Sequence, residues 1–203
     1  NENLFGTGKG GIYMRIAGKK ESWLIEGIVS TGSGPADWVS KKILDISGGA
    51  MKQLQITSPK GGRVAVGRKA VKDKNFTLEE IPAGKRQRGE WETNQMPKAF
   101  ENLELIDLKR ADEMDFAKAP YKGSFTTFDG LVIKSEAAKI GKKYWVRLSA
   151  TVTDAADETT KKRAKSINDR LVGYIYEVKE EVGKKLACEH VNLLEGAGVK
   201  ACA

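Results

Sequence analysis

Two short glycine-containing turns, about seventy residues apart, constrain the fold of this 203-residue chain more than any other feature. The first has the sequence PKGG at 59–62, and the second is Asp129-Gly130, a dipeptide typical of β-hairpins. Apolar and polar residues alternate on both sides of each turn, which predicts strands that bury one face. These strands are expected at 52–58, 63–69, 124–128 and 131–135.

A helix is expected ahead of each pair of strands, because Pro35 and Pro97 both suit the first turn of a helix. The first helix is predicted at 35–46 and the second from Pro97 onward. A third strand is expected after each pair, at 75–81 and at 143–152. Because this order occurs twice, the sequence predicts an α+β fold of two related helix-plus-antiparallel-three-strand units, which we expect to superpose.

The remaining segments extend this pattern at both ends of the chain. Apolar runs at 12–17 and 22–29, joined by the turn GKK, predict an N-terminal β-hairpin. A long C-terminal helix is expected at 154–171, followed by a strand at 173–178 and a short helical segment at 179–194. The predicted organisation is a flexible lead-in at 1–10, a first α+β unit at 11–95, a second at 96–195 and a tail at 196–203.

Basic residues outnumber acidic residues, 35 to 27, which gives a formal net charge of +8. Such an excess favours acidic partners. The charges are nevertheless spread along the chain and lysine predominates, whereas nucleic-acid readers favour arginine, so nucleic acid is not the expected partner. One basic cluster lies beside an aromatic residue in an expected surface loop, and it is the candidate partner-binding site: Lys85, Arg86, Arg88 and Trp91.

Known catalytic and cofactor-binding motifs do not match the chain. His190 is the only histidine, and no Gly-x-Ser-x-Gly sequence presents a nucleophile. Structural zinc needs four ligands, but His190 and Cys188 are joined only by Cys202 and scattered carboxylates. The glycine-rich segment 6–11 lacks the Ser or Thr that follows the lysine of a phosphate-binding loop. We therefore predict no cofactor, no metal and no catalytic residues.

The four tryptophans have different sequence surroundings. Trp23 and Trp145 lie within apolar strand runs, and Trp38 begins the apolar face of the first predicted helix. These three are predicted to pack in the core. Trp91 lies among charged residues and is predicted to be exposed.

The sequence constrains the cellular location only in part. No apolar run approaches the roughly 20 residues that a membrane span needs, and no secretory signal is present. The chain begins at Asn1, so we expect it to be an excised or processed portion of a longer protein, which leaves an upstream anchor or signal open. A disulfide between Cys188 and Cys202 is compatible with the sequence, which leaves the redox compartment open.

A series of segments shows a resemblance to a known family: GGIYMRIAGKKESWLIEG, PADWVSKKILDI, VGRK, NFTLEEIPAG, FTTFDGLVI, YWVRLSA and GYIYEV. Through them the chain resembles the bacterial family catalogued as domain of unknown function 4340, over residues 10–194. The shared elements are structural, such as Trp38 and the Asp129-Gly130 hairpin. The resemblance therefore assigns no catalytic residues.

The resemblance implies a location and a context. Members of that family usually carry an N-terminal membrane helix, face the outside of the inner membrane, and are often auxiliary components of ABC-type transport systems. It implies a periplasmic module whose partners are membrane transport proteins and whose membrane association comes from an upstream segment. We hypothesise a non-catalytic interaction or scaffold module; the alternative is a carboxylate-dependent enzyme or binder acting on envelope polymers.

Three structural features distinguish these hypotheses from each other and from nucleic-acid binding. A cleft with paired carboxylates favours the enzyme, and a single continuous basic face favours the polyanion binder. An exposed apolar groove or an open sheet edge favours the scaffold.

Overall fold

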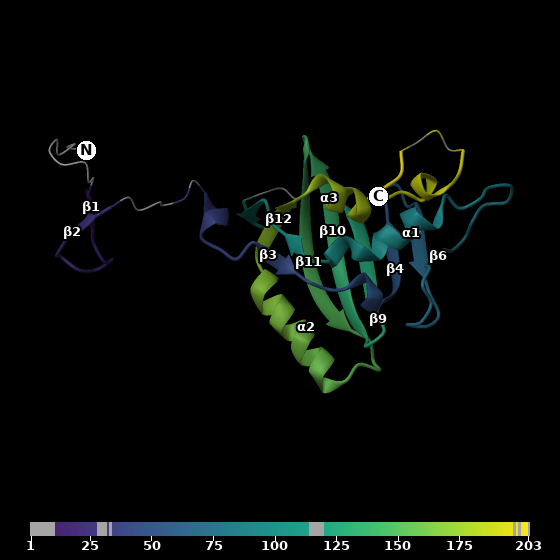
Figure 1. Cartoon of the computed structure of the whole chain (residues 1–203), viewed down its shortest axis with the longest axis horizontal. Helices are drawn as coiled ribbons and strands as arrows, with labels where there is room; N and C mark the ends of the chain where they lie inside the picture. The colour runs from purple at the N-terminus through teal and green to yellow at the C-terminus, as the bar shows by residue number, and fades with distance from the viewer. Residues whose placement is uncertain are drawn as a thin grey trace.

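The computed structural model, which describes residues 11–27, 32, 34–113, 120–196, 198 and 200–202, is dominated by one antiparallel sheet (Figure 1). Its eight strands lie in the order β6-β5-β4-β9-β10-β11-β12-β8. Their bounds are Met51–Thr57 (β4), Arg63–Gly67 (β5), Thr77–Leu78 (β6), Asp107–Arg110 (β8), Tyr121–Thr127 (β9), Leu131–Ile140 (β10), Lys143–Val152 (β11) and Tyr174–Val178 (β12). Segments 51–78 and 107–178 therefore contribute to a single sheet.

The other described elements are short. Two further pairs of strands form separate two-stranded sheets: β1 (Gly11–Met14) with β2 (Trp23–Glu26), and β3 (Lys42–Leu44) with β7 (Leu103–Glu104). The α-helices are α1 (Glu90–Gln95), α2 (Glu158–Leu171) and α3 (Glu180–Leu186). The 3-10 helices are η1 (Pro35–Asp37), η2 (Gly48–Ala50), η3 (Met96–Phe100) and η4 (His190–Leu193).

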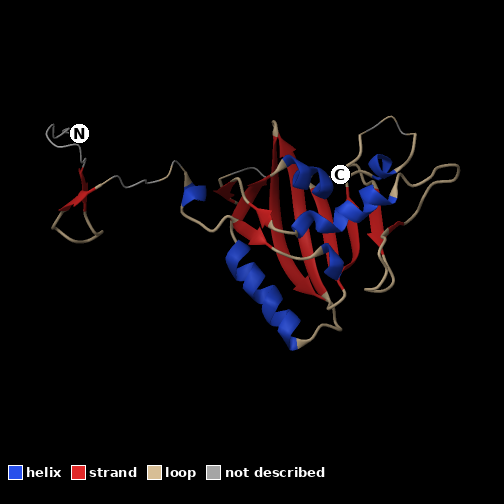
Figure 2. Cartoon of the chain, in the orientation of Figure 1, coloured by secondary structure: helices blue, strands red, loops and turns tan. Residues whose placement is uncertain are grey.

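One face of the large sheet carries the core. Figure 2 shows the helices in front of this face. Side chains from α2, α3 and η3 share a single hydrophobic cluster with the inward-facing residues of the strands, because period-two alternation turns every second side chain to that face. Members of this cluster include Ile167, Leu186, Phe100, Phe125, Ile133 and Val146.

Glycine allows two close approaches within this core. At Gly123 the ring of Phe125 lies where a side chain would be, and Phe125 in turn packs edge-on against Phe100 at 4.7 Å between ring centroids. At Gly183, α3 lies directly on the ring of Tyr144, and a side chain there would collide with it. These two contacts hold the helical layer close to β9 and β11.

The predicted fold of two helix-plus-three-strand units is wrong. Strands β4 and β9, which the sequence pattern assigns to different units, pair antiparallel from Met51↔Thr127 to Thr57↔Lys122, with a register shift between Met51 and Gln53. This ladder fuses the two sets of strands into one mainly antiparallel sheet with a shared core. The third strands also differ, since β6 has two residues whereas β11 has ten.

The helix predictions fail for local reasons. Only the turn η1 forms after Pro35, and the apolar residues that follow enter strand β3 instead of a helix face. Pro97 lies inside η3, which continues α1 rather than beginning a long helix. The expected long C-terminal helix is also wrong, because α2 begins at Glu158 rather than Asp154 and has only 14 residues. The strand and the short helical segment expected after it are present as β12, α3 and η4.

The tryptophan predictions divide in the same way. Trp145 is 3% exposed, as predicted, and Trp91 is exposed, as predicted. Trp38 is 71% exposed because no helix forms to turn it inward, so its placement in the core was wrong. The N-terminal hairpin is present, but its Trp23 is 47% exposed and lies outside the core. Residues 1–10, the expected lead-in, lie outside the described residues.

Phe125 and Trp38 provide a direct test of where the core lies. We expect Phe125→Ala to lower the free energy of unfolding by about 3–5 kcal/mol, because a fully buried ring is lost from contact with Phe100. We expect Trp38→Ala to change it by less than about 0.5 kcal/mol, since the side chain is exposed. Denaturant unfolding of both variants measures the difference, and equal destabilisation would contradict this assignment of the core.

Candidate interaction surfaces

The N-terminal hairpin lies apart from the rest of the molecule (Figure 1). Its strands pair with each other from Gly11↔Glu26 to Met14↔Trp23, and among the described residues neither strand joins another sheet. Large apolar side chains are exposed on both faces of the hairpin and next to its turn: Tyr13, Met14, Ile16, Trp23, Leu24 and Ile25. A hairpin of this size is marginally stable alone, so these side chains form an apolar surface without a described cover.

A second hairpin in the same chain shows how such a surface is covered. The turn between β10 and β11 repeats the sequence Gly-Lys-Lys, and both turns place their glycine at positive φ, 80° at Gly18 and 63° at Gly141. A tryptophan follows each turn, Trp23 in β2 and Trp145 in β11. The β10–β11 hairpin is flanked by β9 and β12, whereas β1–β2 has no described neighbour. This internal match is a sequence signal that the predictions from strand alternation missed.

The predicted cluster of Lys85, Arg86, Arg88 and Trp91 spans two kinds of structure. Trp91 lies on α1, and the three basic residues precede that helix. Their backbone is anchored to the end of η4 and to the chain just after it: Arg88 N–H donates to Leu193 O at 2.7 Å, and Arg86 O accepts from the N–H of Glu195 at 2.9 Å. The stretch is therefore held in place rather than free.

Gln87 explains why this stretch is ordered. Its backbone forms an isolated bridge with Leu194, while its side chain accepts from Leu78 N–H at 3.1 Å and donates to Thr93 Oγ1 at 3.0 Å. One side chain thus links β6 to α1. Nothing in the local sequence indicated this role, because Leu78 and Thr93 are not sequence neighbours of Gln87 and no known sequence motif joins these three residues.

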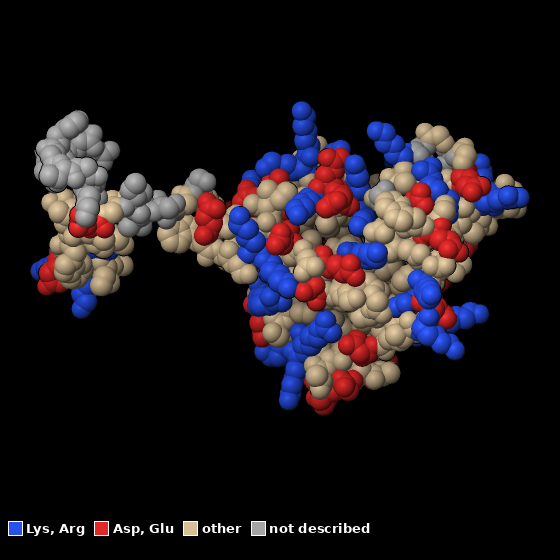
Figure 3. Space-filling view, in the orientation of Figure 1, with Lys and Arg blue, Asp and Glu red and all other residues tan. Residues whose placement is uncertain are grey.

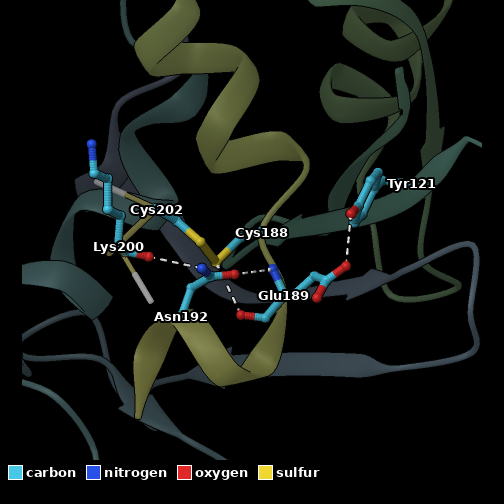
Figure 4. Close-up of a disulfide and its surroundings, with 6 residues drawn as sticks. All are labelled: Tyr121, Cys188, Glu189, Asn192, Lys200 and Cys202. Carbon is cyan, nitrogen blue, oxygen red and sulfur yellow. Dashed lines mark hydrogen bonds between the residues drawn. A yellow bond between two sulfur atoms is a disulfide. The ribbon is translucent and has the colours of Figure 1, made fainter. Parts of the chain in front are cut away.

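A disulfide closes the C-terminal segment that holds this stretch (Figure 4). Cys188 and Cys202 are bonded and almost fully buried, so neither sulfur is free to bind zinc. Within the closed loop, Asn192 Nδ2 donates to Lys200 O at 2.7 Å, and Asn192 Oδ1 accepts from Glu189 N–H at 3.1 Å. The segment expected as a tail is thereby tied to η4.

Glu189 also ties the loop to the large sheet. The hydroxyl of Tyr121 in β9 donates to Glu189 Oε1 at 2.9 Å (Figure 4). Burial of the phenol and the adjacent carboxylate together raise the pKa of Tyr121 to about 12. Tyr121 therefore stays neutral and keeps donating this hydrogen bond over the whole physiological range.

The described residues provide little for metal or acid-base chemistry. No group of three or more His, Cys, Asp or Glu side chains gathers among them. One hollow, of about 340 Å³, is lined by two aspartates, Asp129 and Asp157. Asp129 accepts from Leu131 N–H, and Asp157 caps α2 by accepting from Thr160 N–H at 2.7 Å, a bond that lowers the pKa of Asp157. Both carboxylates thus have structural partners.

Positive charge does not form one continuous face in the view of Figure 3. Lysine and arginine are interspersed with aspartate and glutamate over the helix-covered side of the molecule. Several basic residues are paired within α2 and α3, including Lys161 with Glu158, Lys165 with Asp169 and Lys184 with Glu180. Such a surface is typical of a solvated protein face.

Comparison with known proteins yields no relative. No protein-family model matches the chain, and no match was found among curated proteins or among solved structures. Among the described residues, no helix has the length and apolar character required to cross a membrane.

Removal of the disulfide tests its contribution to the fold. We expect the double variant Cys188→Ser, Cys202→Ser to lose about 3 kcal/mol of unfolding free energy, the value for a loop of about 15 residues. Amide exchange at Arg88 should also become faster, because its N–H donates to Leu193 O in the released loop.

Denaturant unfolding measures the loss of stability, and hydrogen exchange measures the faster exchange. Wild-type protein under reducing conditions provides a second sample that lacks the disulfide. A reducing agent should not change the stability of the double variant. Unchanged exchange at Arg88 would show that the disulfide does not support this stretch.

Proposed function

We propose that this chain is a non-catalytic, extracytoplasmic interaction module, an accessory part of a cell-envelope ABC-type transport system, and that its N-terminal hairpin docks onto a membrane transport protein. The observation that carries the proposal is the apolar surface of β1–β2. The described residues of the hairpin present an exposed apolar surface with open strand edges, the feature that favours the scaffold among the three that distinguish the hypotheses.

The hairpin has the properties of a docking element. Among the described residues its two outer edges pair with no other strand, so a strand of the partner can add to the hairpin, and apolar residues project from both faces. In the matching β10–β11 hairpin, where β12 pairs with β11 and Lys109 lies over the ring, Trp145 is 3% exposed, against 47% for Trp23. Burial of six such side chains would supply a favourable term for association, at about 25 cal/mol per Å² of apolar surface.

The disulfide supports the proposed location. Disulfides persist in oxidising compartments such as the periplasm and are rare in the cytosol. Cys188–Cys202 is almost fully buried. It closes the segment 188–202, which is hydrogen-bonded to the backbone of Arg86 and Arg88, so the disulfide is part of the folded structure.

Two observations support binding rather than catalysis. A glycosidase-type acid needs a carboxyl group with a raised pKa, whereas the pKa of Asp157 is lowered by its helix-capping bond. Its neighbour Asp129 is hydrogen-bonded to Leu131 N–H and lies near Arg163. The hollow that holds both aspartates is thus poorly suited to carboxylate catalysis.

Site-specific photocrosslinking tests the proposal. A photoreactive amino acid placed at Tyr13 or Trp23 in the full-length, membrane-anchored protein should crosslink to a membrane transport component, because both side chains lie on the exposed apolar hairpin. Mass spectrometry of the crosslinked species identifies the partner.

Val71 provides the matched control, since it is an exposed apolar residue in the loop after β5, outside the hairpin. Crosslinks from Val71 alone, or equal crosslinks from all three positions, would contradict docking through the hairpin. A partner other than a transport component would contradict the proposed context while leaving the docking element intact.

A further inference from the structure

The face of the large sheet opposite the helices carries a hollow of about 640 Å³. Strand register fixes the side chains that point to this face. One row across β9, β10 and β11 contains Lys122, Glu136 and Arg147, and the next contains Ser124, Lys134 and Ser149. All of these residues except Ser124 line the hollow, and its volume falls within the range of about 300–1,000 Å³ seen for small-molecule sites.

The charged side chains that line the hollow have a positive excess. Glu136 is the only carboxylate among the described lining residues, and Arg147 Nε donates to it at 2.7 Å. Lys134 Nζ donates to Ser124 Oγ at 3.1 Å, a neutral partner. Lys122 has no carboxylate partner among the described residues. Two lysine charges therefore remain without a counter-charge at the floor of the hollow.

An apolar wall stands beside these lysines. The ladder between β11 and β12 ends at the pair Val146↔Tyr176. Beyond it, the turn between α2 and β12 lies beside the unpaired part of β11. Leu171 at the end of α2, Val172 in the turn and Tyr174 at the start of β12 line the hollow. Val172 is 73% exposed, although it is a large apolar side chain. The hollow thus combines a cationic floor with an uncovered apolar wall.

Asn168 gives this wall a fixed position. Its side-chain oxygen accepts from Ala150 N–H at 2.7 Å, and its side-chain nitrogen donates to Ala150 O at 2.8 Å. The amide thereby occupies the place that a neighbouring strand would take along β11, so α2 and the turn that follows it are anchored to the sheet. The turn that carries Val172 is thus held between two elements attached to the sheet, α2 and β12.

We infer that this hollow binds an amphipathic anion, a molecule with one phosphate or carboxylate group joined to an apolar chain. The acidic group lies over Lys122 and Lys134, whose charges complement it, and the chain lies against Val172 and Tyr174. The site is separate from the hairpin, so it can bind whether or not a protein partner is docked there.

Calorimetric titration with monomeric dodecyl phosphate, below the concentration at which micelles form, tests the inference on the whole chain. We expect saturable binding that weakens as ionic strength rises. The variant Lys122→Gln, Lys134→Gln should lose affinity by at least about tenfold, because charge-assisted hydrogen bonds to the acidic group are removed. Val172→Asp should also weaken binding, because it places a carboxylate in the apolar wall.

The control variant is Lys60→Gln, Lys72→Gln, which removes two exposed lysines elsewhere and should leave binding unchanged. Dodecyl maltoside, which has the same chain and no charge, and inorganic phosphate, which has no chain, should both bind much more weakly. The inference is overturned if dodecyl phosphate does not bind, if either control compound binds as tightly, or if the Lys122, Lys134 variant retains the affinity of the control variant.

Discussion

The antiparallel ladder between β4 and β9 determines how the rest of this molecule is arranged. It pairs Leu54 with Phe125 and Ile56 with Gly123, residues from two parts of the chain that are separated by α1, η3 and β8. Within β9, the ring of Phe125 lies over Gly123 and packs against Phe100. Without the ladder, neither set of strands would bury its apolar face against the shared helical layer.

The ladder also decides which surfaces are left open. Helices cover one face of the large sheet, so the opposite face keeps its polar rows and the hollow beside Val172. Strands β1 and β2 are left out of that sheet, although their turn and tryptophan match those of β10 and β11. The two proposed binding surfaces, the hairpin and the hollow, thus follow from one pattern of strand pairing.

Local signals in the sequence predicted local structure well. Asp129-Gly130 identified the β9–β10 hairpin, and alternation identified β11, because both depend on neighbouring residues. The same signals could not show that β4 pairs with β9. Two separate three-strand units and one joined sheet would bury the same face of each strand. Trp38 was misplaced because a helix start was inferred from Pro35 alone. The anchoring of Arg86 and Arg88 depends on contacts with Leu193 and Glu195, which have no local signature.

We expect the sheet joined by β4 and β9 to unfold as one cooperative unit, of which the N-terminal hairpin is not part. Hydrogen exchange of the isolated chain across a denaturant series tests this expectation most directly. We predict that peptides from β4, β9, β10 and β11 lose protection together, while residues 11–27 exchange at once under native conditions. Protection of 11–27 equal to that of β10 and β11, or separate opening of β4 and β9, would contradict this arrangement.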